Sequence, residues 1–201
     1  MLFRSPRALR DTTRRQAQLR TVAKPPPVTV RLERPRPEHQ REFFRAVERS
    51  RKLHGNLVAP PSTPAAFRRY LARNELPHFI GHFVMAGGEL AGVINVSEIV
   101  LNNFRSAFLG YYAFTPHAGT GVMTRGLTLV VTRAFRSYRL HRLEANIQPD
   151  NQASIALVRR LGFRLEGYSP RYLRIAGRYR DHERWAVTVE DWRAGSRRSR
   201  S

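Results

Sequence analysis

Two glycines that stand two residues apart, Gly119 and Gly121, precede an apolar stretch with the spacing of a helix. Glycine lets the backbone turn sharply and leaves the N–H groups of the turn uncovered. The first N–H groups of a helix have no partner in that helix and carry a partial positive charge, so they can bind an anion without a charged side chain. The pair therefore predicts a phosphate site, although an ordinary turn between a strand and a helix has the same pattern.

The segments around this turn supply the elements that would position it. Residues 108–114 are apolar and aromatic, which predicts a buried strand leading into the turn. Residues 143–148 alternate between apolar and polar side chains and predict a second strand, and Asn151 can cap a helix over 152–161 that ends at Gly162. This order of strand, turn, helix and strand predicts a right-handed crossover, with the turn at the carboxyl end of the first strand.

The rest of the chain predicts further strands and helices on both sides of this unit. Gly87 and Gly88 are typical of a hairpin turn between two of the strands. The helices are expected over 37–50 and 64–74, and the strands over 28–32, 78–85, 89–97, near 172–175 and over 182–189. Together these elements predict one mixed α/β domain over residues 28–192.

Several segments resemble, in order, the GNAT-type N-acetyltransferases. Gly119-Thr-Gly-Val-Met123 resembles their acetyl-CoA pyrophosphate loop, and Asn151-Gln-Ala-Ser154 resembles the start of the helix that follows. The pattern is most similar to the RimJ-type ribosomal-protein-alanine N-acetyltransferases, which residues 140–142, 161–168 and 172–182 also match. The resemblance spans Val30–Trp192 and implies a mostly antiparallel sheet flanked by helices. It also implies acetyl-CoA as donor and, as acceptor, the N-terminus of a protein, namely a ribosomal protein that begins with alanine.

The resemblance also implies how acetyl-CoA is bound. The glycine turn would hold the pyrophosphate, and Ala118 lacks the Gln or Arg side chain that the family usually has at the start of this loop. The strand before the turn would offer backbone donors to the thioester oxygen and pair with the amide arm. The 3′-phosphate would meet Arg125, Arg159 or Arg160. The expected contacts are Tyr112, Ala113, Phe114, Thr115, Ala118, Gly119, Thr120, Gly121, Val122, Met123, Asn151 and Ser154.

Transfer of acetyl to an amine needs a group that takes the amine proton and a stabilised oxyanion. Glu144 and Asn146 project from one face of their predicted strand. Glu144 could take the proton directly or through a water held by Asn146, or it could simply pair with a nearby arginine such as Arg142 or Arg164. Glu98, just after another predicted strand, is the second candidate base.

The departing thiolate needs a proton as well. Many family members carry a tyrosine for this purpose on the second helix, where this chain has Val158. Ser154, one turn into that helix, is placed to hydrogen-bond the thiolate or a relay water. Otherwise Tyr111, Tyr112 or Tyr172 must reach the sulfur from another element.

The acceptor side is expected to include five residues that resemble the family's acceptor cluster or lie near it. Asp181 and His182 are adjacent on a strand and point to opposite faces, so they cannot act on each other as a catalytic dyad. The breaker-rich loop 53–61 also borders the cleft, and its His54 and Asn56 either contact substrate or are merely solvated. The predicted substrate contacts are Tyr111, Tyr172, Arg180, Asp181 and His182.

The chain carries a formal net charge of +21 that is not confined to its ends. Such a charge favours approach to RNA or a ribosome, or it is a solubilising arginine-rich surface. Residues 1–27 are expected to form a disordered basic arm and residues 193–201 a disordered basic tail. The arm has the composition of a mitochondrial transit peptide, but an extension of a bacterial enzyme fits the resemblance better, so the cytoplasm is the expected compartment.

The composition excludes several other classes of protein. There is no cysteine, which excludes disulfides, thiolate metal sites and a cysteine nucleophile. No apolar run approaches the ~20 residues that a membrane-spanning helix needs. His78 and His82 are four apart on a predicted strand and do not converge, so no metal is expected.

Three functions are compatible with the sequence. The favoured one is an N-terminal acetyltransferase, acting as a monomer or dimer and able to contact RNA through its basic surface. The second is an acetyltransferase for a small amine such as an aminoglycoside or polyamine, which the shortage of acidic residues disfavours. The third is a non-catalytic protein that binds RNA or the ribosome and senses acetyl-CoA.

Overall fold

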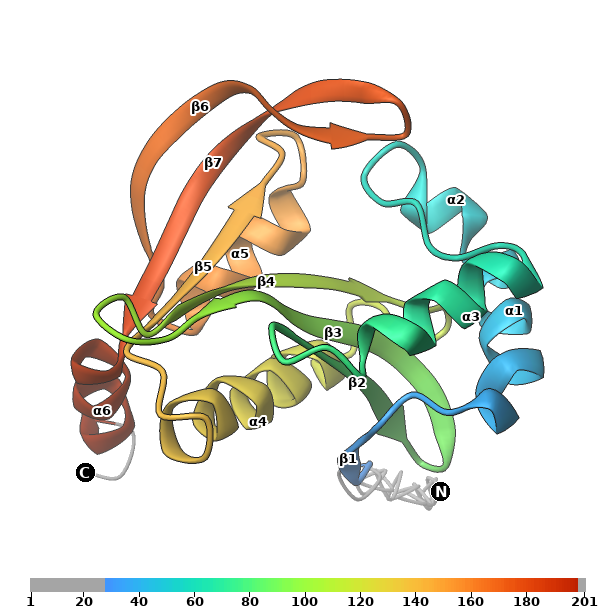
Figure 1. The fold of residues 1–201 in the computed structure, drawn as a ribbon, viewed down its shortest axis with the longest axis horizontal. Helices are drawn as coiled ribbons and strands as arrows, with labels where there is room; N and C mark the ends of the chain where they lie inside the picture. The colour runs from blue at the N-terminus through green and yellow to red at the C-terminus, as the bar shows by residue number, and fades with distance from the viewer. Residues whose placement is uncertain (1–27, 199–201) are drawn as a thin grey trace, which may run out of the picture.

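The structure is a computed structural model and describes residues 28–198. The predicted basic arm, 1–27, and residues 199–201 of the predicted tail lie outside the described residues. In chain order the elements are β1 (Val30–Glu33), a 3-10 turn (Pro37–His39), α1 (Gln40–Arg49), α2 (Arg51–His54), α3 (Pro64–Arg73), β2 (Phe79–Ala86), β3 (Glu89–Val100), β4 (Ser106–Ala113), α4 (Val122–Arg136), β5 (Arg142–Ile147), α5 (Gln152–Arg160), β6 (Arg164–Ile175), β7 (Arg178–Thr188) and α6 (Val189–Arg198) (Figure 1).

Seven strands form one sheet in the order β1-β2-β3-β4-β5-β7-β6. The pair β4 and β5 is parallel, and all other neighbouring pairs are antiparallel. The predicted mixed α/β class with a mostly antiparallel sheet is therefore confirmed. Gly87 and Gly88 form the turn between β2 and β3 with φ of +60° and +92°, a left-handed conformation that favours glycine.

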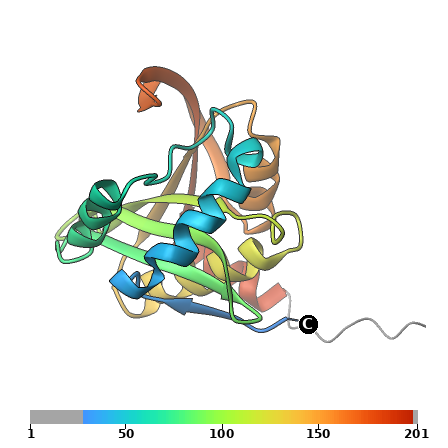
Figure 2. The same ribbon diagram turned by 90° about the vertical axis from the view of Figure 1, so that its right-hand side faces the viewer.

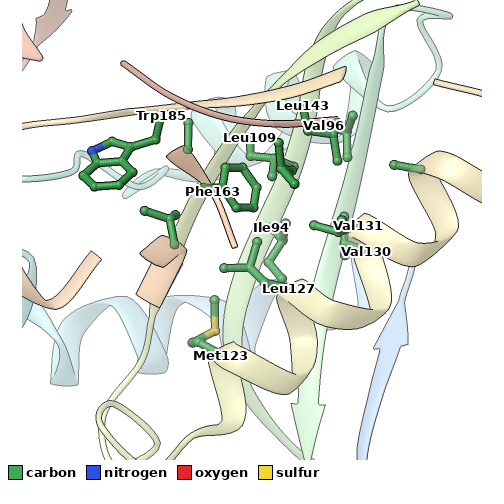
Figure 3. Packing of buried hydrophobic residues seen from close by; sticks show 14 of the residues in the cluster. Ile94, Val96, Leu109, Met123, Leu127, Val130, Val131, Leu143, Phe163 and Trp185 are labelled. Carbon is green, nitrogen blue, oxygen red and sulfur yellow. The ribbon is translucent and has the colours of Figure 1, made fainter. Parts of the chain in front are cut away.

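Each face of the sheet has its own hydrophobic core. On one face α4 packs Met123, Leu127 and Val130 against the side chains of β3 and β4 (Figure 3). On the other face α1 and α3 pack aromatic rings, among them Phe43 and Phe67, against β2, β3 and the end of β4. Figures 1 and 2 show α1, α2 and α3 grouped on one side of the molecule, with α4 along the other.

The parallel pair is short, and this opens the sheet. Strands β4 and β5 are paired only where Ser106–Phe108 face Arg142–Glu144. Beyond Phe108, β4 stays paired with β3, whereas β5 continues along β7. The edges of β4 and β5 that face each other are therefore unpaired toward the carboxyl ends of both strands. This gap lies next to the glycine turn.

The C-terminal part differs from the sequence prediction. Strands β6 and β7 begin at Arg164 and Arg178, so they form a longer hairpin than the predicted segments near 172–175 and over 182–189. The predicted tail from residue 193 is the continuation of α6, which ends at Arg198. The structure has a capping box here: Thr188 Oγ1 accepts from the Asp191 N–H and Asp191 Oδ2 accepts from the Thr188 N–H, each at 3.4 Å. Such a cap satisfies the first N–H groups of a helix.

Candidate active site

A cavity of about 280 Å³ lies at the carboxyl end of β4. Its walls come from four parts of the chain: α2 with the loop after it, β4, the glycine turn with the start of α4, and α5. None of the lining residues is acidic. They are Leu53, His54, Leu57, Val58, Tyr111, Tyr112, Ala113, Ala118, Gly119, Gly121, Met123, Thr124, Asn151, Ala153, Ser154, Leu157 and Arg160.

The glycine turn has the geometry of an anion site. Gly119 and Gly121 have φ of +76° and +81°, which an L side chain adopts only at a cost. The N–H groups of Ala118 and Thr120 bond within the turn, whereas no hydrogen bond among residues 28–198 uses the N–H of either glycine. The first N–H groups of α4 have no acceptor in their own helix either. The uncovered donors thus lie at one wall of the cavity.

Met123 is accommodated by a glycine on the neighbouring strand. A Cβ atom added at Gly92 would overlap Met123 Sδ and lie 2.8 Å from the carbonyl oxygen of Tyr112. Because Gly92 has no side chain, the Met123 side chain can pack against β3 in the core.

Ser154 and Tyr111 form a hydrogen-bonded pair in the cavity wall. The Ser154 hydroxyl donates to Tyr111 Oη at 2.6 Å, and Asn151 caps α5 by accepting from the Ser154 N–H at 3.2 Å. Burial raises the pKa of Tyr111 to about 12, so its hydroxyl keeps its proton at neutral pH. Tyr111 was predicted as a substrate contact and also as one of three tyrosines that could reach the sulfur. The structure places it on the side of α5, because alternation along β4 turns Tyr111 and Tyr112 to opposite faces.

The backbone at the end of β4 is only partly free. The Phe114 N–H donates to Ala91 O at 2.8 Å, and the Thr115 N–H donates to Ser50 Oγ at 3.0 Å. These two donors, expected to serve the cofactor, are therefore occupied. Because N–H groups alternate sides along an antiparallel strand, the Phe114 bond toward β3 implies that the Ala113 N–H points into the gap toward β5. Ala113 is the residue of this segment with a donor left for a ligand.

A family profile described as "Acetyltransferase (GNAT) domain" matches residues 29–164. The chain belongs to the GNAT acetyltransferase family. It is 38% identical over 117 residues to ribosomal protein uS5-alanine N-acetyltransferase of Escherichia coli, covering 58% of this chain and 60% of that protein. It is 33% identical over 125 residues to the Bacillus subtilis protein named Probable N-acetyltransferase YjcK, covering 62% and 68%. The chain thus spans about 60% of the length of the first of these curated relatives.

A solved relative extends the similarity to the structure. Mycobacterium smegmatis RimJ in complex with CoA-disulfide superposes with a TM-score of 0.74 at 26% identity, covering 83% of this chain and 87% of that chain. The similarity therefore extends beyond the residues that the family profile matches. That relative was solved with a CoA derivative bound.

In this GNAT domain the three arginines considered for the 3′-phosphate have different surroundings. Arg125 donates to the Val28 carbonyl oxygen at 2.8 Å. Arg159 lies over the ring of Trp185, with Cζ 5.1 Å from the ring centroid. Of the three, Arg160 is the one that lines the cavity.

The candidate bases lie outside the cavity. Glu144 is held by Arg142, with Nε 2.9 Å from Oε1, and Arg142 also bonds Glu166. The structure thus favours the ion-pair interpretation of Glu144. Glu98 lies at the β3 bulge near the start of β4, whereas the cavity lies at the end of β4. Asn146 lies on the face of β5 opposite the core residues Ala145 and Ile147, and its Oδ1 is buried without a hydrogen-bond partner among the described residues.

A groove beside α3 adjoins the cavity. Tyr112 and Val58 line both, and the groove is also lined by Tyr70, Asn95 and Arg69. Tyr112 therefore stands between the two spaces. Because α3 covers the face of the sheet opposite α4, the groove offers an approach to the gap from the side away from the glycine turn.

Of the residues predicted to contact the acceptor, four lie on the β6–β7 hairpin and line neither space. The ring centroids of Tyr172 and His182 lie 6.3 Å apart. The Asp181 carboxylate accepts from the Tyr168 hydroxyl and from the backbone N–H of Arg171, and these bonds lower its pKa. His182 is buried and donates through Nδ1 to the carbonyl oxygen of Arg180 at 2.9 Å. Asp181 and His182 thus hold the hairpin together.

His54 was expected in a solvated loop or against substrate, and the structure buries it. It ends the short helix α2, which the sequence pattern did not predict, and its Nε2 donates to the carbonyl oxygen of Ala113 at 2.9 Å. Burial lowers its pKa, so the ring is neutral at neutral pH. The breakers at Gly55 and beyond masked this helix. The one sequence signal for burial here was the pair of apolar residues Leu53 and Leu57, which flank Gly55.

Metal and membrane features are absent from residues 28–198. No group of three or more His, Asp and Glu side chains in that range could hold a metal ion. The described helices include none long and apolar enough to cross a membrane. His82 is buried in the core with Nδ1 unpartnered among the described residues, and His78 lies just before the first residue of its strand.

Proposed function

We propose that this protein transfers acetyl from acetyl-CoA to the α-amine of a protein N-terminus, with a ribosomal protein that begins with alanine as acceptor. The observation that carries the proposal is the single cavity into which the uncovered donors of the glycine turn, the Ser154–Tyr111 pair and the Ala113 edge of β4 all open. The relative named for uS5-alanine acetylation supports the choice of acceptor.

The cavity suits a ligand with several phosphates. Its lining has no acidic side chain, and it combines the N–H donors at Gly119 and Gly121 with the guanidinium of Arg160. Backbone donors at a helix N-terminus and an arginine are common partners of phosphate. Acetyl-CoA, when bound here, supplies the thioester carbon that an amine can attack.

Three further steps then fall to the residues of the chain: stabilising the oxyanion, protonating the sulfur and deprotonating the amine. The Ala113 N–H, which points into the gap, is placed to donate to an oxygen that gains negative charge. The Ser154 and Tyr111 hydroxyls hold a proton near the cavity wall that the departing sulfur needs. Glu144 is occupied by Arg142, so we assign removal of the amine proton to a water molecule beside Asn146.

A small polycationic amine fits the site less well. Neither the lining of the cavity nor that of the groove includes an Asp or Glu. The groove instead contains Arg69 and Arg73. A polyamine has several positive charges, which would lie near these arginines without a carboxylate to pair with. A peptide N-terminus brings only one amino group into the gap between β4 and β5.

The test is intact-mass analysis of peptides that differ only in their first residue, incubated with the protein and acetyl-CoA. We expect one added acetyl group on Ala- and Ser-initiated peptides and none when the α-amine is blocked. Acetylation of spermidine in parallel wells, with no peptide modified, would instead support the small-amine function. Acetyl-CoA binding without any acetylation, together with salt-sensitive RNA binding, would support a sensor or scaffold.

A further inference from the structure

Gly110 leaves an opening in the middle of β4. A Cβ atom added there would find no atom within 4 Å, unlike at the crowded positions Gly92 on the neighbouring strand β3 and Gly81 on β2. Its φ lies outside the left-handed region, so the backbone does not require glycine. Glycine inside a strand often marks a place where another chain or ligand approaches closely. We therefore attribute glycine at this position to the open space that the missing side chain leaves next to the sheet.

Two amide side chains flank this opening on the same face. Asn95 is paired with Gly110 across β3 and β4. Phe108 is paired with Glu144 across β4 and β5, so two residues further along each strand Gly110 and Asn146 also face the acceptor side. The face is the one that carries Tyr112 and α3, opposite the Ser154–Tyr111 pair. The row of Asn95, Gly110 and Asn146 lies where β4 and β5 begin to separate.

The two amides offer opposite hydrogen-bonding groups. The Tyr70 hydroxyl donates to Asn95 Oδ1 at 3.0 Å, which leaves Asn95 Nδ2 as the donor of that amide. Asn146 Oδ1 is a buried acceptor without a partner among the described residues, and an unsatisfied buried acceptor costs free energy that a ligand donor would recover. The row therefore complements a group that carries an N–H donor next to a carbonyl acceptor.

We propose that this row seats the first residue of the acceptor, and this inference rests on the proposed function. The α-amine donates to Asn146 Oδ1, the first carbonyl accepts from Asn95 Nδ2, and Gly110 leaves room for the residue between them. A peptide N-terminus has this donor and acceptor on adjacent groups, and a polyamine has no carbonyl to offer. Gly110 is thus a specificity-determining position.

The test compares Gly110→Val and Gly110→Ala with the wild-type protein. Because nothing lies within 4 Å of the new side chain's Cβ position, both variants should fold with an unchanged melting temperature and an unchanged KM for acetyl-CoA. We expect the KM for an Ala-initiated peptide to rise at least tenfold in Gly110→Val and severalfold in Gly110→Ala. Gly195→Ala, which adds a methyl group in open space on α6, is the matched control and should leave both KM values unchanged.

The outcomes separate this inference from the proposed function. A Gly110→Val protein that keeps the wild-type KM for the peptide overturns the inference alone, because the wild-type protein still acetylates the peptide. If the valine variant is destabilised, the alanine variant decides, since it adds a single methyl group. A wild-type protein that acetylates spermidine and no peptide overturns the proposed function, and the inference that rests on it falls as well.

Discussion

Replacing Gly121 by alanine separates the role of the glycine turn in folding from its role in binding. Gly121 precedes α4 with φ of +81°, and no atom lies within 4 Å of the Cβ position. The cost to folding is therefore backbone strain, about 1–2 kcal/mol for an L residue in the left-handed region. For a domain of this size that lowers the melting temperature by about 2–8 °C.

Gly162 provides a control with the same backbone geometry. It also has φ of +81° and open space around its Cβ position, but it follows α5 and does not line the cavity. Gly162→Ala should therefore lose about the same stability as Gly121→Ala. Any difference between the two variants in the response to acetyl-CoA then reports on the turn as a binding site.

The expected difference follows from linkage. Acetyl-CoA at one hundred times its Kd stabilises the folded protein by about 2.7 kcal/mol. If the added methyl group at Gly121 weakens binding tenfold, the same concentration gives only about 1.4 kcal/mol. Thermal unfolding with and without acetyl-CoA should show that the ligand-induced rise in melting temperature is about halved in Gly121→Ala and intact in Gly162→Ala. An equal rise in both variants would refute the assignment of the phosphates to this turn.

Three further predictions concern side chains. Tyr111→Phe removes the acceptor of the Ser154 hydroxyl bond, so steady-state assays should show kcat reduced about a hundredfold or more with the KM for acetyl-CoA unchanged; an unchanged kcat would exclude Tyr111 as the proton source. Glu144→Gln breaks the ion pair with Arg142 and should leave peptide turnover unchanged across pH, since a carboxylate base would instead show a large loss. Burial and Arg133 lower the pKa of His82 to about 4, so folding stability should fall as pH drops from about 6.5 to about 4; urea unfolding of His82→Gln should show a shallower decline, and an equal decline would contradict this.

The sequence was sufficient to predict the central crossover. The paired glycines and the apolar runs on either side predicted β4, α4 and β5, and the parallel pairing of β4 with β5 agrees with that prediction. The hairpin at Gly87 and Gly88 was equally clear, since two consecutive glycines between strands specify a tight turn. These features are local, so the residues that form them are adjacent in the chain.

The sequence predictions failed where structure depends on distant contacts. Strand β6 includes Gly167 and Pro170 and has no apolar alternation, and its pairing with β7 is interrupted by register shifts. His54 is buried by a bond to Ala113, 59 positions away in the chain. The capping pair Thr188 and Asp191, in contrast, is a local signal for α6 that the charge of the C-terminal segment obscured.

The placement of Tyr111 shows what limited the prediction of the site. Strand β4 lies between α5 on one face of the sheet and α3 on the other. Because side chains alternate along a strand, every second side chain of β4 faces the α5 side and the others face the α3 side. Tyr111 goes to the cavity wall with Ser154, while Gly110 and Tyr112 go to the acceptor side. A shift of one residue in the β3–β4 register would exchange the two sets. The bond of Phe114 to Ala91 fixes that register at the end of the strand, and the bond of Thr115 to Ser50 ties the following residue to the end of α1. The donors that the sequence predicted for acetyl-CoA therefore hold the end of β4 in place instead.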